Sequence, residues 1–101
     1  MQFLIHAFDS TDSEAINRRM AARPAHIAKC DELFAQGHLH FGVALLNNSD
    51  TMIGSTMVAE FESREALNAW LAIEPYVVGK VWEKVEVIPC KIGPSFMKKP
   101  S

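Results

Sequence analysis

The segment from Arg23 to His26 carries the residue best suited to acid–base chemistry in this chain. An imidazole exchanges protons readily near neutral pH, which suits a general acid or base. On a helical projection from Pro24, His26 falls at the margin of an apolar stripe, where a cleft can reach it. A histidine on a helix surface, without a chemical role, is the alternative interpretation.

Two further positions have side chains that suit a binding or catalytic site. Glu74 directly precedes Pro75, and a residue before proline is driven out of the helical conformation. We therefore expect the Glu74 carboxylate on a loop with no local partner, although a solvated acid is the alternative. Ser55 follows Gly54 at the start of a predicted strand, where glycine permits close approach and the hydroxyl can bind a ligand. An ordinary strand entry remains the other interpretation of this segment.

The remaining histidines do not predict a metal site. His38 and His40 are two residues apart and share one side of a predicted strand, but a metal needs a third and usually a fourth ligand. Neither cysteine stands in a CxxC or CxH pattern. His6 lies among apolar residues of the first strand, which favours a structural histidine. Nucleotide-binding, serine-hydrolase and zinc-protease motifs are also missing from the sequence.

Length and charge exclude several classes of protein. The chain has 101 residues, enough for one domain, and a formal net charge of -2 from 10 basic and 12 acidic residues. Nucleic-acid and polybasic membrane sites need a basic excess, so we expect neither kind of partner. No apolar run approaches the roughly 20 residues that span a bilayer, and no signal peptide is recognised. We therefore expect a cytoplasmic protein with Cys30 and Cys90 as free thiols, although a bridge between them stays open.

Hydrophobic periodicity and turn residues divide the chain into four strands and two helices, the first helix in two pieces. We expect a helix from the polar caps 9–13 to Ala22, a junction at Arg23, and a second helical piece, because proline is not tolerated within a helix. Gly37 should end that piece in a left-handed conformation. The elements expected are strands at Gln2–Phe8, Leu39–Leu46, Ile53–Phe61 and Val81–Ile92, with helical pieces at 14–22, Pro24–Gln36 and Arg64–Ile73, the last capped by Ser63.

This order is the ferredoxin-like βαββαβ arrangement, an α+β fold with a four-stranded antiparallel sheet and both helices on one side. The first strand is apolar on both faces, and the last carries Trp82 and Ile88 opposite its valines. A large uncovered apolar face implies a partner, so we predict a homodimer through the sheets that buries Phe3, Ile5 or their opposite-face neighbours together with Trp82 and Ile88. The domain should span residues 1–92, and 93–101 should form a loosely held tail. The residues expected on the core side of the helices are Ile27, Cys30, Leu33, Phe34, Leu67, Trp70 and Leu71.

Several segments in combination resemble one known family. They are Arg23–Ile27, Gly37, Gly42, Ile53–Ser63, Glu74–Tyr76 and Val85–Pro89. In this order and spacing they resemble the YciI-like (YCII-related) family over nearly the whole chain. The resemblance implies a dimeric α+β barrel whose site is built around a histidine and an acid. Some members of the family are dehydrochlorinases that eliminate HCl from a hydroxylated ring, and the superfamily includes muconolactone isomerases and small monooxygenases that need no cofactor.

The resemblance also assigns roles by position. The family histidine falls on His26, its arginine on Arg23, its serine on Ser55, and its acid on Glu74, where the family usually has aspartate. His26 would then move a proton while Glu74 orients it, and Arg23 would hold a carboxylate or phenolate. We expect His26 and Glu74 to meet in one cleft between the helices and the sheet, with Arg23 and Ser55 at its rim. A further departure is Gly42-Val43-Ala44, where the family commonly has Gly-Pro, and this implies a different choice of substrate.

Two functional hypotheses follow, with a third in reserve. The first is a small enzyme without cofactor or metal that performs elimination or isomerisation on a small cyclic oxygenated or aromatic-derived metabolite. The alternative is a non-catalytic module that binds a small molecule in the same cleft or supports a neighbouring enzyme. A purely structural or interaction role would be favoured if Met52 or Trp82 filled the cleft.

Overall fold

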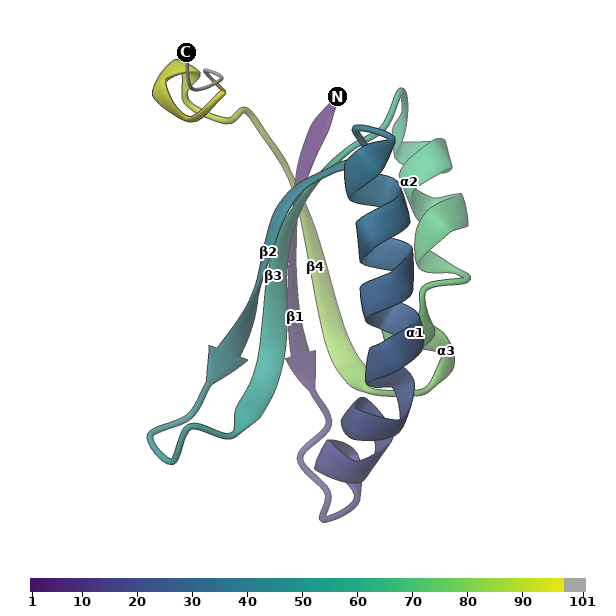
Figure 1. Ribbon diagram of the computed structural model, residues 1–101, viewed down its shortest axis with the longest axis vertical. Coiled ribbons are helices and arrows are strands. Elements are labelled where there is room, and N and C mark those ends of the chain that lie inside the picture. The colour runs from purple at the N-terminus through teal and green to yellow at the C-terminus, as the bar shows by residue number, and fades with distance from the viewer. Residues whose placement is uncertain (98–101) are drawn as a thin grey trace.

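The computed structural model describes residues 1–97, which form an antiparallel sheet covered on one face by helices (Figure 1). The strands lie in the order β2-β3-β1-β4, which is the ferredoxin-like order. The predicted α+β fold is therefore confirmed. The elements are β1 (Gln2–Asp9), α1 (Ala15–Ala35), β2 (Leu39–Leu46), β3 (Met52–Glu60), α2 (Arg64–Leu71), α3 (Pro75–Val78), β4 (Trp82–Cys90) and the 3-10 helix η1 (Pro94–Phe96).

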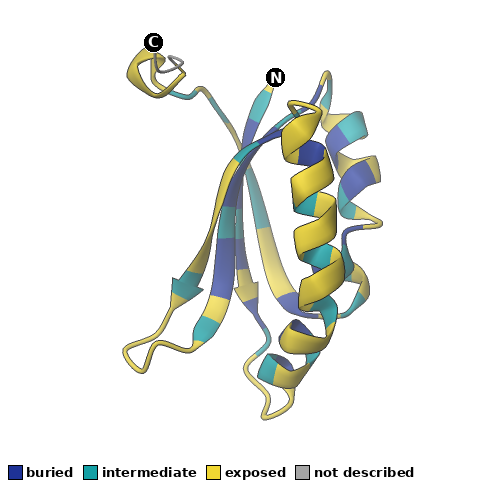
Figure 2. Cartoon of the chain, in the orientation of Figure 1, coloured by how far each residue is buried: buried dark blue, intermediate teal, exposed yellow. Residues whose placement is uncertain are grey.

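The core lies between the sheet and the helices. Successive strand residues point to opposite faces, and in β1 the buried apolar residues are Phe3, Ile5 and Ala7. They belong to one apolar cluster with Leu67 and Trp70 of α2. Figure 2 shows buried segments in the strands and in α2. Ser63 caps α2 as predicted, because its Oγ accepts a hydrogen bond from the Ala66 N–H at 3.1 Å.

Helix α1 is continuous, so the predicted junction at Arg23 is wrong. Pro24 removes one N–H, and the carbonyl left without that donor belongs to Met20. Both residues are exposed, which leaves the site of the missing hydrogen bond on the solvent side of the helix. The helix therefore passes through the proline and keeps Arg19 and His26 on one stripe, seven residues apart.

The predicted core stripe of α1 is only partly correct. Leu33 is buried and Cys30 is half-buried, but Ile27 and Phe34 are 42% and 66% exposed. The C-terminal end is as predicted, because Gly37 takes a φ of 82° directly after the helix. Helix α1 therefore packs only part of its apolar side against the sheet.

A β-bulge places Trp82 on the helical face, which corrects the prediction that it faces outward. Residue Phe8 pairs with Lys84, but Asp9 pairs with Trp82, so one extra residue of β4 lies between these pairs. The bulge reverses the alternation of faces at the start of β4. Trp82 consequently joins the core with Phe3 and is not available for a contact between subunits.

A second register shift, between Leu39 and Phe41, changes the faces of β2. Phe41 pairs with Val58, and Val58 pairs with Leu4, so their side chains share the uncovered face of the sheet. Ile88 of β4 pairs with Leu4 on its other side and completes an apolar row. We call Ile88, Leu4, Val58 and Phe41 the open-face row.

Several smaller features complete the description. Helix α2 ends two residues earlier than predicted, and Pro75 begins the short helix α3. Within residues 1–97 both cysteines are unbridged, as predicted. The tail begins with η1, and Phe96 is 84% exposed, while positions 98–101 of the predicted tail lie outside the described residues. No helix among the described residues is long and apolar enough to span a membrane.

The close contact of β3 with β1 at Gly54 gives a test of this register. A Cβ at Gly54 would lie 2.5 Å from the Ala7 carbonyl oxygen, so Gly54→Ala must push the strands apart. We expect a loss of about 1–3 kcal/mol in the free energy of unfolding, measured with urea. Gly42→Ala is the matched control, because its Cβ would meet no atom nearer than 3.5 Å. Equal stability of the two variants would contradict the register.

Candidate functional site

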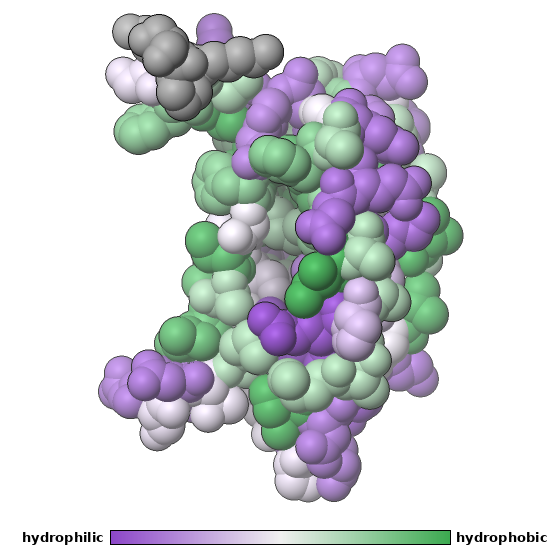
Figure 3. All heavy atoms as spheres, viewed as in Figure 1, coloured by the Kyte–Doolittle hydropathy of each residue, from purple (hydrophilic) through white to green (hydrophobic). Residues whose placement is uncertain are grey.

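A cavity of about 360 Å³ lies between α1 and the β2–β3 half of the sheet. Figure 3 shows the hollow between the strands and α1. Register pairs Gly42 with Met57 and Ala44 with Ser55, so small residues of β2 face the helical side and leave room there. The remaining lining residues are Arg19, Arg23, His26, Ile27, Cys30, Asp31, Phe34, Leu39, Phe41, Val43, Met52 and Tyr76.

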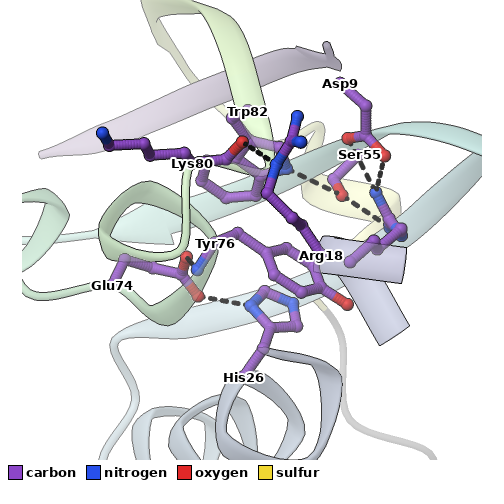
Figure 4. Close-up of polar contacts among 9 residues, drawn as sticks. Asp9, Arg18, His26, Ser55, Glu74, Tyr76, Lys80 and Trp82 are labelled. Carbon is purple, nitrogen blue, oxygen red and sulfur yellow. Dashed lines mark hydrogen bonds and ion pairs between the residues drawn. The ribbon is translucent and has the colours of Figure 1, made fainter. Parts of the chain in front are cut away.

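His26 lines this cavity, and its imidazole contacts the carboxylate of Glu74. The Nδ1 atom of His26 contacts Oε1 of Glu74, and Figure 4 shows this pair. The Glu74 residue is only 1% exposed and does not line the cavity itself. The structure thus brings together the two residues that the sequence predicted as a pair.

Glu74 also has a local partner, which corrects the expectation of a loop acid without one. Its other oxygen, Oε2, accepts the backbone N–H of Tyr76 at 2.5 Å. Glu74 thereby caps α3, and Pro75 occupies the first position of that helix. The proline that frees Glu74 from α2 therefore places its carboxylate at the start of the next helix.

Tyr76 connects His26 to the rest of the wall. The imidazole of His26 stacks on the Tyr76 ring with centroids 3.8 Å apart and planes 10° apart. The Arg19 guanidinium lies 4.8 Å from the centroid of the same ring, and Trp82 meets it edge-on at 5.6 Å. Burial raises the pKa of the Tyr76 phenol above its ordinary value, so the hydroxyl keeps its proton at neutral pH.

The second ring nitrogen of His26 lies on the side of Cys30. The distance from Nε2 to the Cys30 Sγ is 3.5 Å, and both residues line the cavity. Burial, with a smaller contribution from Glu74, raises the pKa of the Cys30 thiol to about 11. Cys30 is therefore a protonated thiol beside the imidazole and not a nucleophile at neutral pH.

A buried network of Asp9, Arg19 and Ser55 forms the deep end of the wall. Arg19 Nη1 donates to both carboxylate oxygens of Asp9, at 2.9 and 3.0 Å, and Nη2 donates to Ser55 Oγ at 3.0 Å. Trp82 Nε1 donates to the same Oγ at 3.3 Å. Burial raises the pKa of Asp9 against the opposing effect of Arg19. Ser55 is thus 4% exposed and lies in the wall, not at the rim where we expected it.

Sequence reasoning missed Asp9 and Arg19. Asp9 continues the odd-numbered alternation of Phe3 and Ile5, which would have placed it on the helical face. Arg19 precedes His26 by seven residues, which places both on one side of an unbroken helix. Because we predicted a junction at Arg23, Arg19 and His26 were placed on separate helical pieces, and their position on one side of a single helix was missed.

Arg23, the fourth predicted residue, is exposed and lines the cavity. Among residues 1–97 no hydrogen bond or ion pair joins it to His26, Glu74 or Ser55. Its guanidinium therefore adds positive charge at the solvent side of the cavity without touching the buried pair.

The other histidines have structural partners. His6 Nδ1 lies 2.7 Å from Thr56 Oγ1, as expected for a structural histidine. His38 Nδ1 lies 2.8 Å from the Glu60 carbonyl oxygen, and His40 Nε2 lies 2.6 Å from Glu60 Oε1. Within the described part of the chain, no group of three or more metal-ligating residues comes together.

Comparisons with known proteins agree with the resemblance seen in the sequence. The family model for the YCII-related domain matches residues 1–91. Protein YciI of Escherichia coli O6:H1 and Protein YciI of Shigella flexneri are each 38% identical over 97 residues, which cover 90% of this chain and 97% of the relative. A solved structure of TftG from Burkholderia phenoliruptrix, a 5-chloro-2-hydroxyhydroquinone dehydrochlorinase in complex with 2,5-dihydroxybenzoquinone, has a TM-score of 0.79. It is 23% identical, and the match covers 94% of this chain and 98% of that one.

The raised thiol pKa predicts slow alkylation of Cys30. At mildly alkaline pH the buried thiol should carry about 100-fold less thiolate than an ordinary cysteine and react more slowly by a similar factor. Iodoacetamide labelling of a Cys90→Ser variant, folded and in denaturant, measures this ratio. A folded rate equal to the denatured rate would mean that Cys30 is open to solvent.

Proposed function

This chain belongs to the YCII-related domain family, and from that premise we propose that it is a small enzyme in which His26 and Glu74 transfer protons without a cofactor. The reaction class proposed is elimination or isomerisation of a small cyclic oxygenated or aromatic-derived compound in the cytoplasm. The observation that carries the proposal is the buried Glu74 carboxylate directly behind an imidazole that lines a cavity.

The proton path follows from the two ring nitrogens. With Glu74 at Nδ1, that nitrogen carries the proton of a neutral imidazole, and Nε2 keeps a lone pair on the Cys30 side of the ring. Nε2 takes a proton from the bound compound, and Glu74 stabilises the imidazolium that results. In an elimination the leaving group departs with its bonding electron pair. In an isomerisation the same proton returns to another atom of the ring system.

The substrate class is supported by the shape and lining of the cavity. Ile27, Phe34 and Met57 supply apolar surface, while Ser55 and Arg23 supply polar groups for the oxygens of a ring compound. TftG, which shares the fold, acts on a chlorinated hydroxyhydroquinone. A hydroxylated ring is therefore the first class of compound to test, with Arg23 and Ser55 as the proposed binding residues.

Exchange of ring hydrogens for deuterium tests the proton transfer without assuming a leaving group. We expect the protein to accelerate exchange at the ring carbons of hydroxyhydroquinone in heavy water, followed by proton NMR. His26→Ala should lower the accelerated rate by about 100- to 10,000-fold, since it removes the base. Glu74→Gln should lower it less, because the imidazole remains.

Glu62→Gln is the matched control, since Glu62 is an exposed acid away from the cavity, and its exchange rate should equal that of the unmodified protein. If the protein binds hydroxyhydroquinone but does not accelerate deuterium exchange at its ring carbons, the proposed enzymatic function is wrong. That outcome would favour the alternative, a non-catalytic module that binds small molecules in this cavity.

We further propose that two copies of the chain associate through the uncovered sheet face. The open-face row is apolar across all strands, and Ile88 and Phe41 are 45% and 50% exposed in the single chain. An apolar face of this kind is stabilised when a partner covers it. Three of the residues predicted for this contact, Phe3, Ile5 and Trp82, lie instead in the core of the chain. The proposed contact between subunits is therefore made by Ile88 and by the even-numbered residues of β1.

Light scattering tests the homodimer. The unmodified protein should show about twice the chain mass of 11.3 kDa at micromolar concentration. Ile88→Lys should give the mass of one chain, because a charge in the open-face row opposes burial. Ile73→Lys is the control, since Ile73 is 62% exposed after α2, and it should remain a dimer. A monomeric unmodified protein would contradict the proposal.

A further inference from the structure

Arg19 holds a donor that the fold leaves unused. Its side chain is only 3% exposed. Nη1 is directed to Asp9 and Nη2 to Ser55, but among residues 1–97 its Nε is buried without a hydrogen-bond partner. Burying an N–H without an acceptor is destabilising, and native proteins do so rarely. The Arg19 guanidinium is therefore only partly paired by the described residues, at Nη1 and Nη2.

Ser55 presents a second unused donor in the same wall. Its Oγ accepts hydrogen bonds from Arg19 Nη2 and Trp82 Nε1, at 3.0 and 3.3 Å. A hydroxyl has two acceptor lone pairs and one proton, so both acceptor positions are filled and only the proton remains to be donated. Within the described residues no side-chain hydrogen bond gives that proton an acceptor. Ser55 and Arg19 both line the cavity.

Two guanidinium groups, those of Arg19 and Arg23, line the cavity together with Ser55. Arg19 is paired with Asp9 at Nη1 alone, and Arg23 adds a second guanidinium at the solvent side. Of the acids, Asp31 lines the cavity, and the carboxylate of Glu74 is occupied by His26 and Tyr76. An incoming ligand oxygen thus meets the Ser55 hydroxyl beside Arg19, whose Asp9 partner is already bound, while the Asp31 carboxylate lies on an exposed residue of the lining.

We propose that Arg19 and Ser55 form a subsite for an anionic oxygen on a ring compound, a phenolate, an enolate or a carboxylate. The Ser55 hydroxyl donates to this oxygen, and the Arg19 guanidinium supplies the charge beside it. This deepens the proposed function, on which it rests for the choice of cavity. Because His26, Arg19 and Ser55 line the same cavity, an oxygen held at Ser55 places the attached ring in the cavity that His26 lines.

Paired probes separate recognition of charge from general binding. Isothermal titration calorimetry uses 2,5-dihydroxybenzoquinone, whose ring hydroxyls are acidic, and its dimethyl ether, which has the same ring without an ionisable oxygen. We expect the unmodified protein to bind the acidic probe at least about tenfold more tightly than the ether, as one charge-assisted hydrogen bond provides.

Ser55→Ala should reduce this preference to less than about threefold, because the donor is lost. Ser13→Ala, an exposed serine in the β1–α1 connection, should keep the preference in full. A merely structural role of Ser55 would weaken both probes alike and leave their ratio unchanged. That result, or equal affinities in the unmodified protein, would overturn the subsite.

The experiments can refute the proposed subsite and the proposed proton transfer independently of each other. His26→Ala removes the base but not the subsite, so it should keep the tenfold preference. If the preference is present but deuterium exchange is absent from the unmodified protein, the subsite stands and proton transfer fails. If exchange is present without the preference, Arg19 and Ser55 are only structural.

Discussion

The buried carboxylate of Glu74 is the constraint on which the site depends. One oxygen accepts the Tyr76 N–H at the start of α3, and the other contacts Nδ1 of His26 in the middle of α1. A carboxylate that is 1% exposed has almost no water to solvate it, and removing one partner of a buried pair destabilises a protein by about 3–5 kcal/mol. The same group therefore joins two helices and fixes the Tyr76 ring against which His26 and Arg19 lie.

Much of the architecture can be predicted from local sequence signals such as strand alternation, helix caps and glycine positions. The alternation of β1 predicts that Phe3 and Ile5 share one face of the sheet, the hydroxyl of Ser63 predicts the start of α2, and Gly37 predicts the end of α1. These signals depend on residues near one another in the chain, so single-sequence reasoning recovers them. The contact of His26 with Glu74, 48 residues apart, followed from the family resemblance and not from periodicity.

The features that sequence reasoning missed depend on contacts between elements. Pro24 was expected to break α1, but an exposed proline leaves the helix intact, and with it the alignment of Arg19 and His26. The faces of Trp82 and Phe41 are set by bulges in β4 and β2, which no alternation within one strand reveals. Ser55 was singled out from its neighbours in the sequence, but its burial follows from Arg19 and Trp82, which reach it across the fold.

We propose that Glu74 holds His26 with the proton on Nδ1, so that Nε2 is the nitrogen that reacts. Long-range proton–nitrogen NMR of the neutral imidazole identifies the protonated nitrogen directly. We expect the proton on Nδ1 and none on Nε2, and we expect Glu74→Gln to weaken this preference. A proton found on Nε2 in the unmodified protein would contradict the account, because the lone pair would then face Glu74 and no base would remain on the Cys30 side.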